Sequence, residues 1–175
     1  DKAEYLANLR GIGEAYRDTD SHDLLGYQAL RVAATRLMAP GDPSTLHVVS
    51  SNREVLVGDR MFPIDDHDLD SHFLPQPPQR QVSGRIIAVL DGVSRIGQYQ
   101  TVVLNLGETK GMRQGDVLAV YQDGERVKDP HGGTVKLPDV RAGLVMVVKP
   151  FKRVSYALVM NAQRDMSLLD RVANP

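Results

Sequence analysis

The fold is decided by residues Gln100–Asp123, which read QTVVLNLGETKGMRQGDVLAVYQD. Thr101–Leu104 and Val117–Tyr121 are rich in β-branched and apolar residues, which favours two strands, and a polar segment with three glycines connects them. Glycine takes positive φ without steric cost, so such a segment suits a sharp reversal of the chain. We therefore expect the two strands to form a hairpin around which the other strands are arranged.

The same alternation of short apolar runs and turn residues continues outward from this stretch in both directions. Runs that recur at roughly ten-residue spacing with turns between them are typical of all-β barrels and sandwiches. The predicted fold class is therefore all-β, with short antiparallel strands and little helix. The predicted strands are Tyr5–Leu9, Gly26–Leu37, Thr45–Val49, Val55–Val57, Arg60–Phe62, Gly84–Leu90, Gly143–Val148, Ser155–Met160 and Leu168–Val172, with loops at Tyr16–Leu25 and Gly124–Val140.

A change in composition divides the chain into two halves. Residues 64–72 are acidic, and Pro75, Pro77 and Pro78 follow within a few positions. Proline lacks a backbone donor and restricts the residue before it, so this region is a linker rather than a strand or helix. We predict a first β lobe over residues 1–63, a linker over residues 64–81 and a second β lobe over residues 82–175.

The two halves resemble each other in sequence, which predicts a duplication. Gly13-Glu14 aligns with Gly124-Glu125 at a spacing of 124 minus 13, or 111 residues, and further pairs share that spacing. The repeat favours a strand at residues 5–9, where helix propensity alone would favour a short helix. It also places residue 9 on residue 120, so we expect the first copy to lack its opening strands, which would lie upstream of Asp1. The further pairs are Arg53-Glu54 with Arg164-Asp165 and Asp59-Arg60 with Asp170-Arg171. The predicted architecture is two duplicated, small barrel-like lobes.

Composition excludes several classes of function. The 175 residues include 21 Lys and Arg against 22 Asp and Glu, a formal net charge of −1, which gives no long-range attraction for nucleic acid or an anionic membrane. The chain has no cysteine, which excludes disulfides, thiolate catalysis and cysteine-based zinc sites. It has no apolar run near the roughly 20 residues that a membrane-spanning helix needs.

No group of residues forms a recognisable catalytic or metal-binding motif. The densest polar cluster, residues 65–72, contains aspartates and histidines, but its spacing matches neither a calcium loop nor a zinc hydrolase, so we interpret it as a solvated linker. No GxSxG motif is present, and Gly107, Gly111 and Gly115 lack the Lys-Ser/Thr that ends a phosphate loop. We therefore predict no catalytic, cofactor-binding or metal-binding residues.

One tract carries a possible ligand surface. Lys149, Lys152 and Arg153 lie next to Phe151 and Tyr156, a basic and aromatic combination that could bind an anionic glycan or a nucleic acid. A charged hairpin tip is the simpler interpretation, and the low aromatic content of 5%, with no Trp, is poor material for stacking on sugars.

Five short motifs resemble those of a known family: Leu25-Gly26-Tyr27, Gly58-Asp59-Arg60, Gly84-Arg85-Ile86-Ile87, Ile96-Gly97-Gln98-Tyr99 and Gly115-Asp116-Val117. The chain is similar, over nearly its whole length, to the region C-terminal to the LysM domain in a family of proteobacterial LysM-containing proteins. The resemblance implies an exported protein of the cell envelope, whose upstream LysM module holds peptidoglycan, and a start at Asp1 that belongs to a longer chain. It supplies no catalytic residue.

Three hypotheses of function follow. The first is a non-enzymatic, periplasmic interaction or spacer module, which presents a β surface or strand edge to another envelope protein and reaches peptidoglycan through LysM. The alternative is a cell-wall turnover enzyme with a metal or carboxylate site between the lobes, where Asp18, His22, Asp129 and His131 would converge. The third, a small-barrel nucleic-acid binder, is disfavoured by the net charge.

Overall fold

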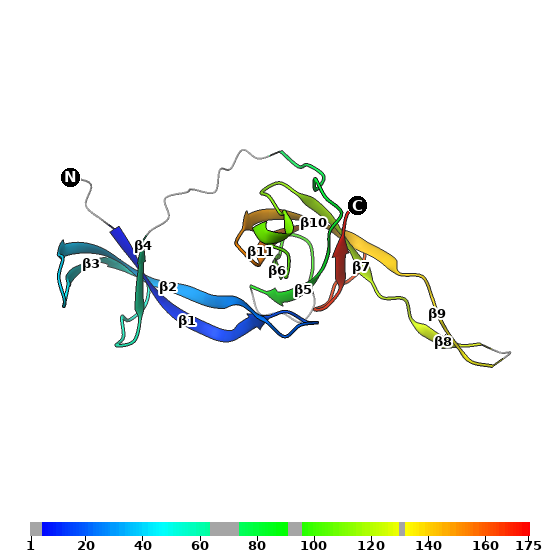
Figure 1. The fold of residues 1–175 in the computed structure, drawn as a ribbon, viewed down its shortest axis with the longest axis horizontal. Helices are drawn as coiled ribbons and strands as arrows, with labels where there is room; N and C mark the ends of the chain where they lie inside the picture. Colours follow the sequence, from blue (N-terminus) through cyan, green and yellow to red (C-terminus); the bar gives the residue numbers. More distant parts are fainter. Residues whose placement is uncertain (1–4, 64–73, 91–95, 130–131) are drawn as a thin grey trace. The chain divides into compact units, whose positions relative to one another are not determined.

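The computed structural model describes residues 5–63, 74–90, 96–129 and 132–175 and confirms the all-β class (Figure 1). It splits into two compact units. The described part of the first unit is residues 5–15 and 27–63, and that of the second is residues 16–26, 74–90, 96–129 and 132–175. The strands are β1 (Tyr5–Arg17), β2 (Leu24–Ala39), β3 (Thr45–Ser51), β4 (Arg60–Pro63), β5 (Ser83–Val89), β6 (Thr101–Leu104), β7 (Val117–Gln122), β8 (Arg126–Lys128), β9 (Thr134–Lys136), β10 (Val140–Pro150), β11 (Ser155–Ala162) and β12 (Arg171–Ala173), with a 3₁₀ turn η1 (Glu108–Lys110).

The second unit is built around a closed, six-stranded antiparallel barrel with the order β10-β11-β6-β5-β12-β7. Alternate residues of each strand point inward, as the period of two requires. Val102 and Leu104 of β6, for example, are fully buried in the barrel core, whereas Val103 between them belongs to a separate apolar cluster. The core also contains Ile86, Ile96, Leu106, Leu118, Val120, Val145, Val147, Val159, Met166 and Val172.

The prediction that residues 100–123 form a hairpin is wrong. β6 and β7 are both strands of the barrel, but β6 pairs with β5 and β11, whereas β7 pairs with β10 and β12. The connection between them does not reverse tightly, because the N–H groups of Glu108 and Thr109 donate instead to the carbonyls of Phe151 and Lys152 in the β10–β11 turn. The connection therefore carries the chain from one side of the barrel to another.

The first unit repeats four strands of the barrel. Its sheet has the order β3-β2-β1-β4, which corresponds to β11-β10-β7-β12 in the second unit. The β2–β3 pairing has register shifts at Ala34/Thr35 and Leu37/Ala39, and the β10–β11 pairing has them at the corresponding Leu144/Val145 and Val147/Lys149. Equal strand order with equal bulge positions is what a duplicated backbone produces. Among the described residues, however, only the second unit closes into a barrel.

Several element boundaries differ from those predicted. The predicted loop at residues 16–25 is shorter, because β1 continues through Arg17 and β2 begins at Leu24. Residues 55–57, predicted as a strand, lead into a turn, and residues 124–140 contain the two short strands β8 and β9. Of the predicted linker, only residues 74–81 are described, and Gln76 there forms a parallel bridge with Asp116.

The same aspartate turn starts three strands, β4, β7 and β12. In each turn a carboxylate oxygen accepts the N–H of the residue three positions earlier at 2.9 Å, and the residue before the aspartate has positive φ. That residue is Gly58 in the first turn, Gly115 in the second and Leu169, at φ 72°, in the third. The aspartates are Asp59, Asp116 and Asp170.

This comparison predicts that placing alanine at Gly115 and placing glycine at Leu169 have different effects on the free energy of unfolding. A left-handed conformation costs a residue with a Cβ roughly 1–2 kcal/mol, so Gly115→Ala should lower the free energy of unfolding by about that amount. Leu169→Gly removes the same conformational cost. The glycine also loses more backbone entropy on folding, which costs about 0.5–1 kcal/mol, so the free energy of unfolding should stay equal or rise slightly. Urea denaturation of both variants measures the difference, and an equal loss in both would contradict it.

Candidate protein-interaction site

A short acidic turn, residues 18–23, connects β1 and β2. The Asp18 carboxylate accepts the N–H groups of Asp20 and Ser21 at 3.0 and 3.1 Å, and these donors hold the pKa of Asp18 below its ordinary value. The N–H of Asp18 in turn donates to the carbonyl of Asp23 at 2.9 Å. Because Asp18 lies opposite Asp23, Tyr16 and Leu25 lie opposite each other on the same face of the hairpin.

The Tyr16/Leu25 pair is seated on the outer face of the barrel. Tyr16 is buried, with an exposed fraction of 8%, and it packs in a cluster separate from the barrel core. Phe151 and Tyr156 line this cluster in an edge-to-face arrangement, with ring centroids 4.9 Å apart. We call this apolar surface the seat. Its other members are Ile87, Ala88 and Leu90 from the end of β5, Val103 of β6 and Val154.

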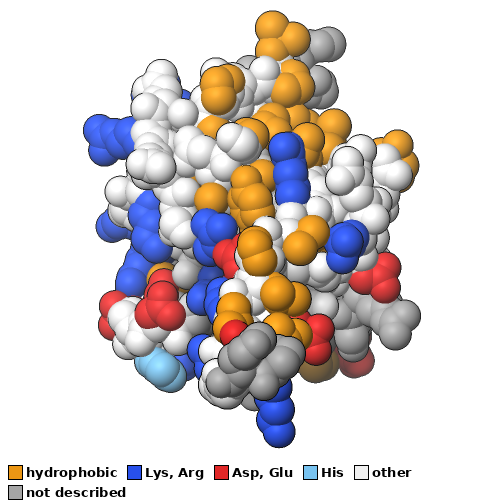
Figure 2. Space-filling model, turned by 90° about the vertical axis from the view of Figure 1, so that its right-hand side faces the viewer, with side chains coloured by type: hydrophobic (Ala, Val, Ile, Leu, Met, Phe, Trp, Pro, Cys, Tyr) orange, Lys and Arg blue, Asp and Glu red, His pale blue; other side chains and the backbone are white. Residues whose placement is uncertain are grey.

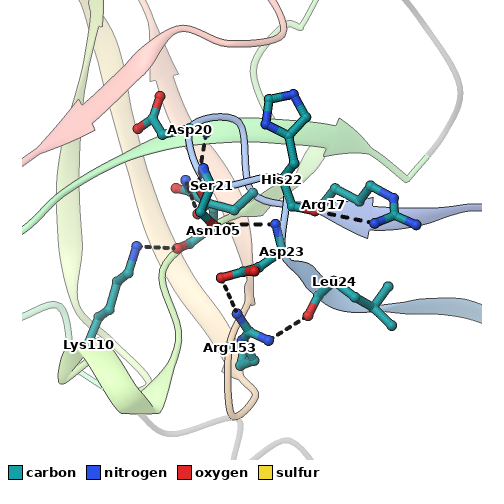
Figure 3. Close-up of polar contacts among 10 residues, drawn as sticks. Arg17, Asp20, Ser21, His22, Asp23, Leu24, Asn105, Lys110 and Arg153 are labelled. Carbon is teal, nitrogen blue, oxygen red and sulfur yellow. Dashed lines mark hydrogen bonds and ion pairs between the residues drawn. The ribbon is translucent and has the colours of Figure 1, made fainter.

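Polar contacts hold the turn at the edge of the seat (Figure 3). Arg153, from the β10–β11 turn, donates to the carbonyl of Leu24 at 2.6 Å and lies 3.6 Å from a carboxylate oxygen of Asp23. On the other side, the Asn105 side chain donates to Asp18 at 3.3 Å and accepts the N–H of Arg85 at 2.7 Å. The seat therefore recognises an acidic β-turn by an apolar face with a cationic rim.

The seat accounts for most of the basic and aromatic tract found in the sequence. Phe151 and Tyr156 line it, Arg153 binds the turn, and the tract lies at the β10–β11 hairpin tip, as the simpler interpretation expected. Lys149 lies over the Phe151 ring, 5.6 Å from its centroid. What the sequence alone did not indicate is that residues 16–26 of the same chain are the ligand, because the contact joins residues more than a hundred positions apart.

A second hairpin has a similar build: β7 pairs with β10, and beyond them β8 pairs with β9. We call residues 123–140 of this hairpin the second arm. Val127 pairs with Val135, and the N–H of Asp129 donates to the carbonyl of Gly133 beyond them. With Asp129 corresponding to Asp18, this valine pair corresponds to Tyr16/Leu25. Val135 is 48% exposed and Val127 is half-buried, so one member of the pair that is seated in the first hairpin is open to solvent in the second. Figure 2, which faces the side where β8 and β9 lie in Figure 1, shows exposed hydrophobic side chains between Lys and Arg side chains.

The base of the second arm is braced against the barrel. Asp139 accepts the N–H of Gly124 at 3.1 Å and contacts Lys136 and Arg171 at 3.1 and 3.3 Å. The Gly124 N–H and then the Lys136 ammonium hold the pKa of Asp139 below its ordinary value. A side chain at Gly124 would collide with the Leu137 carbonyl, so the close approach of the two strands requires glycine. The second arm is therefore a built feature rather than a loose loop.

The residues proposed for a metal or carboxylate site do not form one where they are described. Asp18 and Asp129 each begin a hairpin turn, and His22, at φ 61°, lies within the first turn. His131 and the acidic cluster 65–72 lie outside the described residues. The described part of the chain contains no group of three His, Cys, Asp or Glu side chains that could hold a metal ion. A small polar hollow of about 160 Å³ beside Asp18 is lined by both acidic and basic side chains, including Lys110.

Comparison with known proteins adds no family to these observations. No protein-family model matches the chain, and no curated protein matches it. Among the described residues, no helix has the length and apolar character needed to cross a membrane.

Burial of Tyr16 predicts a dependence of stability on alkaline pH. Burial, and then the nearby Tyr156, raise the pKa of Tyr16 from 10.0 to about 12. The folded state therefore keeps a proton that the unfolded chain loses above pH 10, and the free energy of unfolding should fall as the pH rises from about 10 to 12. The fall should be smaller in Tyr16→Phe, as urea denaturation at pH 9 and pH 11 would show.

At neutral pH, Tyr16→Phe should be neutral or stabilise the protein by up to about 1 kcal/mol. The buried hydroxyl has no hydrogen-bond partner among the described residues, and its desolvation is a cost that Phe does not have. Tyr27→Phe is the matched control, since Tyr27 is 73% exposed and should change neither value. A clear loss of stability in Tyr16→Phe would show that the hydroxyl has a stabilising partner.

Proposed function

We propose that the chain is a non-enzymatic interaction module whose β-hairpins dock on the outer faces of β-barrels. The observation that supports this proposal is the Tyr16/Leu25 pair, which packs on an apolar cluster outside the barrel core of the same chain. Burying an apolar cross-strand pair supplies affinity, and hydrogen bonds to the turn set its position. The second arm repeats the same pairing with Val135 exposed, so it is the part of the chain that we propose to reach a partner.

The valine pair indicates the chemistry of that partner. Val135 is exposed and Val127 is half-buried, and the two valines lie opposite each other on one face of the second arm. The exposed Arg126 and Lys128 point to the other face. The partner surface is therefore an apolar strand face.

The site of action that we propose is the cell envelope. Its support is the resemblance of residues such as Leu25-Gly26-Tyr27 and Gly58-Asp59-Arg60 to the region that follows LysM in envelope proteins. In this proposal LysM provides attachment to peptidoglycan, and residues 1–175 provide the protein contact and the spacing from the cell wall. The partner is accordingly another exported protein.

Photo-crosslinking in cells that make the protein tests the docking. A benzophenone amino acid at Val135 should give one discrete crosslinked product, because this side chain lies at the docking face. The same probe at Thr134 is the matched control, since neighbouring residues of a strand point to opposite faces. The product should disappear in Val127→Asp, and its crosslinked peptide should come from a β-strand surface. No product from Val135, or equal products from both positions, would refute the proposal.

A sedimentation assay with purified peptidoglycan sacculi tests the division of roles. Residues 1–175 alone should remain in the supernatant, whereas the same chain preceded by a LysM domain should sediment with the sacculi. Binding of the isolated chain to sacculi, or release of soluble muropeptides by it, would favour the enzyme of cell-wall turnover instead.

A further inference from the structure

The sheet of the first unit has the strand order of the barrel but not its closure. In the barrel, β5 and β6 fill the interval between β12 and β11. The corresponding strands of the first unit, β4 and β3, each have one partner among the described residues, β1 and β2 respectively. Two strand edges that are paired in one copy of the duplication thus have no partner strand within the described part of the other. Unpaired edges of this kind are templates for added strands.

Side-chain burial shows the same difference at matched positions. Val48, Val55 and Met61 are 44%, 38% and 37% exposed. Their counterparts at the 111-residue spacing, Val159, Met166 and Val172, are fully buried in the barrel core. Apolar residues at core positions of a duplicated fold are expected to be covered, because their exposure costs free energy in water.

The barrel also shows what the covering segment contains. β6 pairs with β11, β5 pairs with β12, and Ile96 in the connection between them bridges to Met166. A single continuous segment, residues 83–104, therefore covers all three of the matched core positions. Val102 and Leu104 are its inward residues on β6, and Ile86 is its inward residue on β5.

We propose that the first unit binds an antiparallel two-strand segment of the same kind as residues 83–104, contributed by a further copy of the repeat. The segment adds one strand to β3 and one to β4 and closes the sheet into a second six-stranded barrel. Main-chain hydrogen bonds along the two edges supply affinity. Alternate residues of the added strands are apolar, as is one residue in the connection between those strands, and together they cover Val48, Val55 and Met61. This site is separate from the second arm and does not rest on its docking.

A fusion protein tests the proposal. A copy of residues 82–111 is joined directly before Asp1 of the full chain, which is the register that the 111-residue spacing dictates. Hydrogen exchange of the β3 and β4 amides should slow at least tenfold relative to the unfused chain, and the fluorescence of a hydrophobic dye bound to the first unit should fall. The matched control is the same fusion with Val102→Asp and Leu104→Asp in the added copy only, which should exchange at the rate of the unfused chain.

Two results would overturn the proposal. The first is equal exchange in the fusion and its control, which would show that the edges do not accept this segment. The second is slow exchange of β3 and β4 in the unfused chain, together with a dimer in sedimentation velocity, which would show that a second copy of the chain covers these edges. Either result leaves the docking of the second arm to be judged by its own crosslinking experiment.

Discussion

The need of every buried strand for a hydrogen-bonded neighbour on both sides is the constraint on which this structure depends. In the second unit the constraint is met by closure, since six antiparallel strands leave no edge and enclose a core that includes Leu104, Leu118 and Val145. It also explains why β6 and β7 are not a hairpin. If they paired with each other, the partners that now close the barrel would be displaced.

The duplication gives the two units the same strand order, although only the second unit is closed among the described residues. β2 and β10 have register shifts at corresponding places, Ala34/Thr35 and Leu144/Val145, and each strand also forms one side of a hairpin. One hairpin ends in an acidic turn on an apolar seat, and in the other Val135 is exposed.

Local patterns predicted the fold class well because the strands are amphipathic and the turns have strong signals. Gly58-Asp59 and Gly115-Asp116 marked strand starts correctly, since an aspartate that bonds to its own turn is a local interaction. The pairing of β6 and the docking of Tyr16 were not predictable in this way. Both depend on contacts across the barrel, and Tyr16 reads as a loop residue until the surface that buries it is known.

The seat shows how a basic and aromatic surface is used within the chain itself. Its cation, Arg153, is satisfied by a backbone carbonyl and a carboxylate, and its aromatic rings are covered by a tyrosine and a leucine. What it provides is a defined position for a β-turn, and the contact joins residues 18–23 to the β10–β11 turn of the same chain.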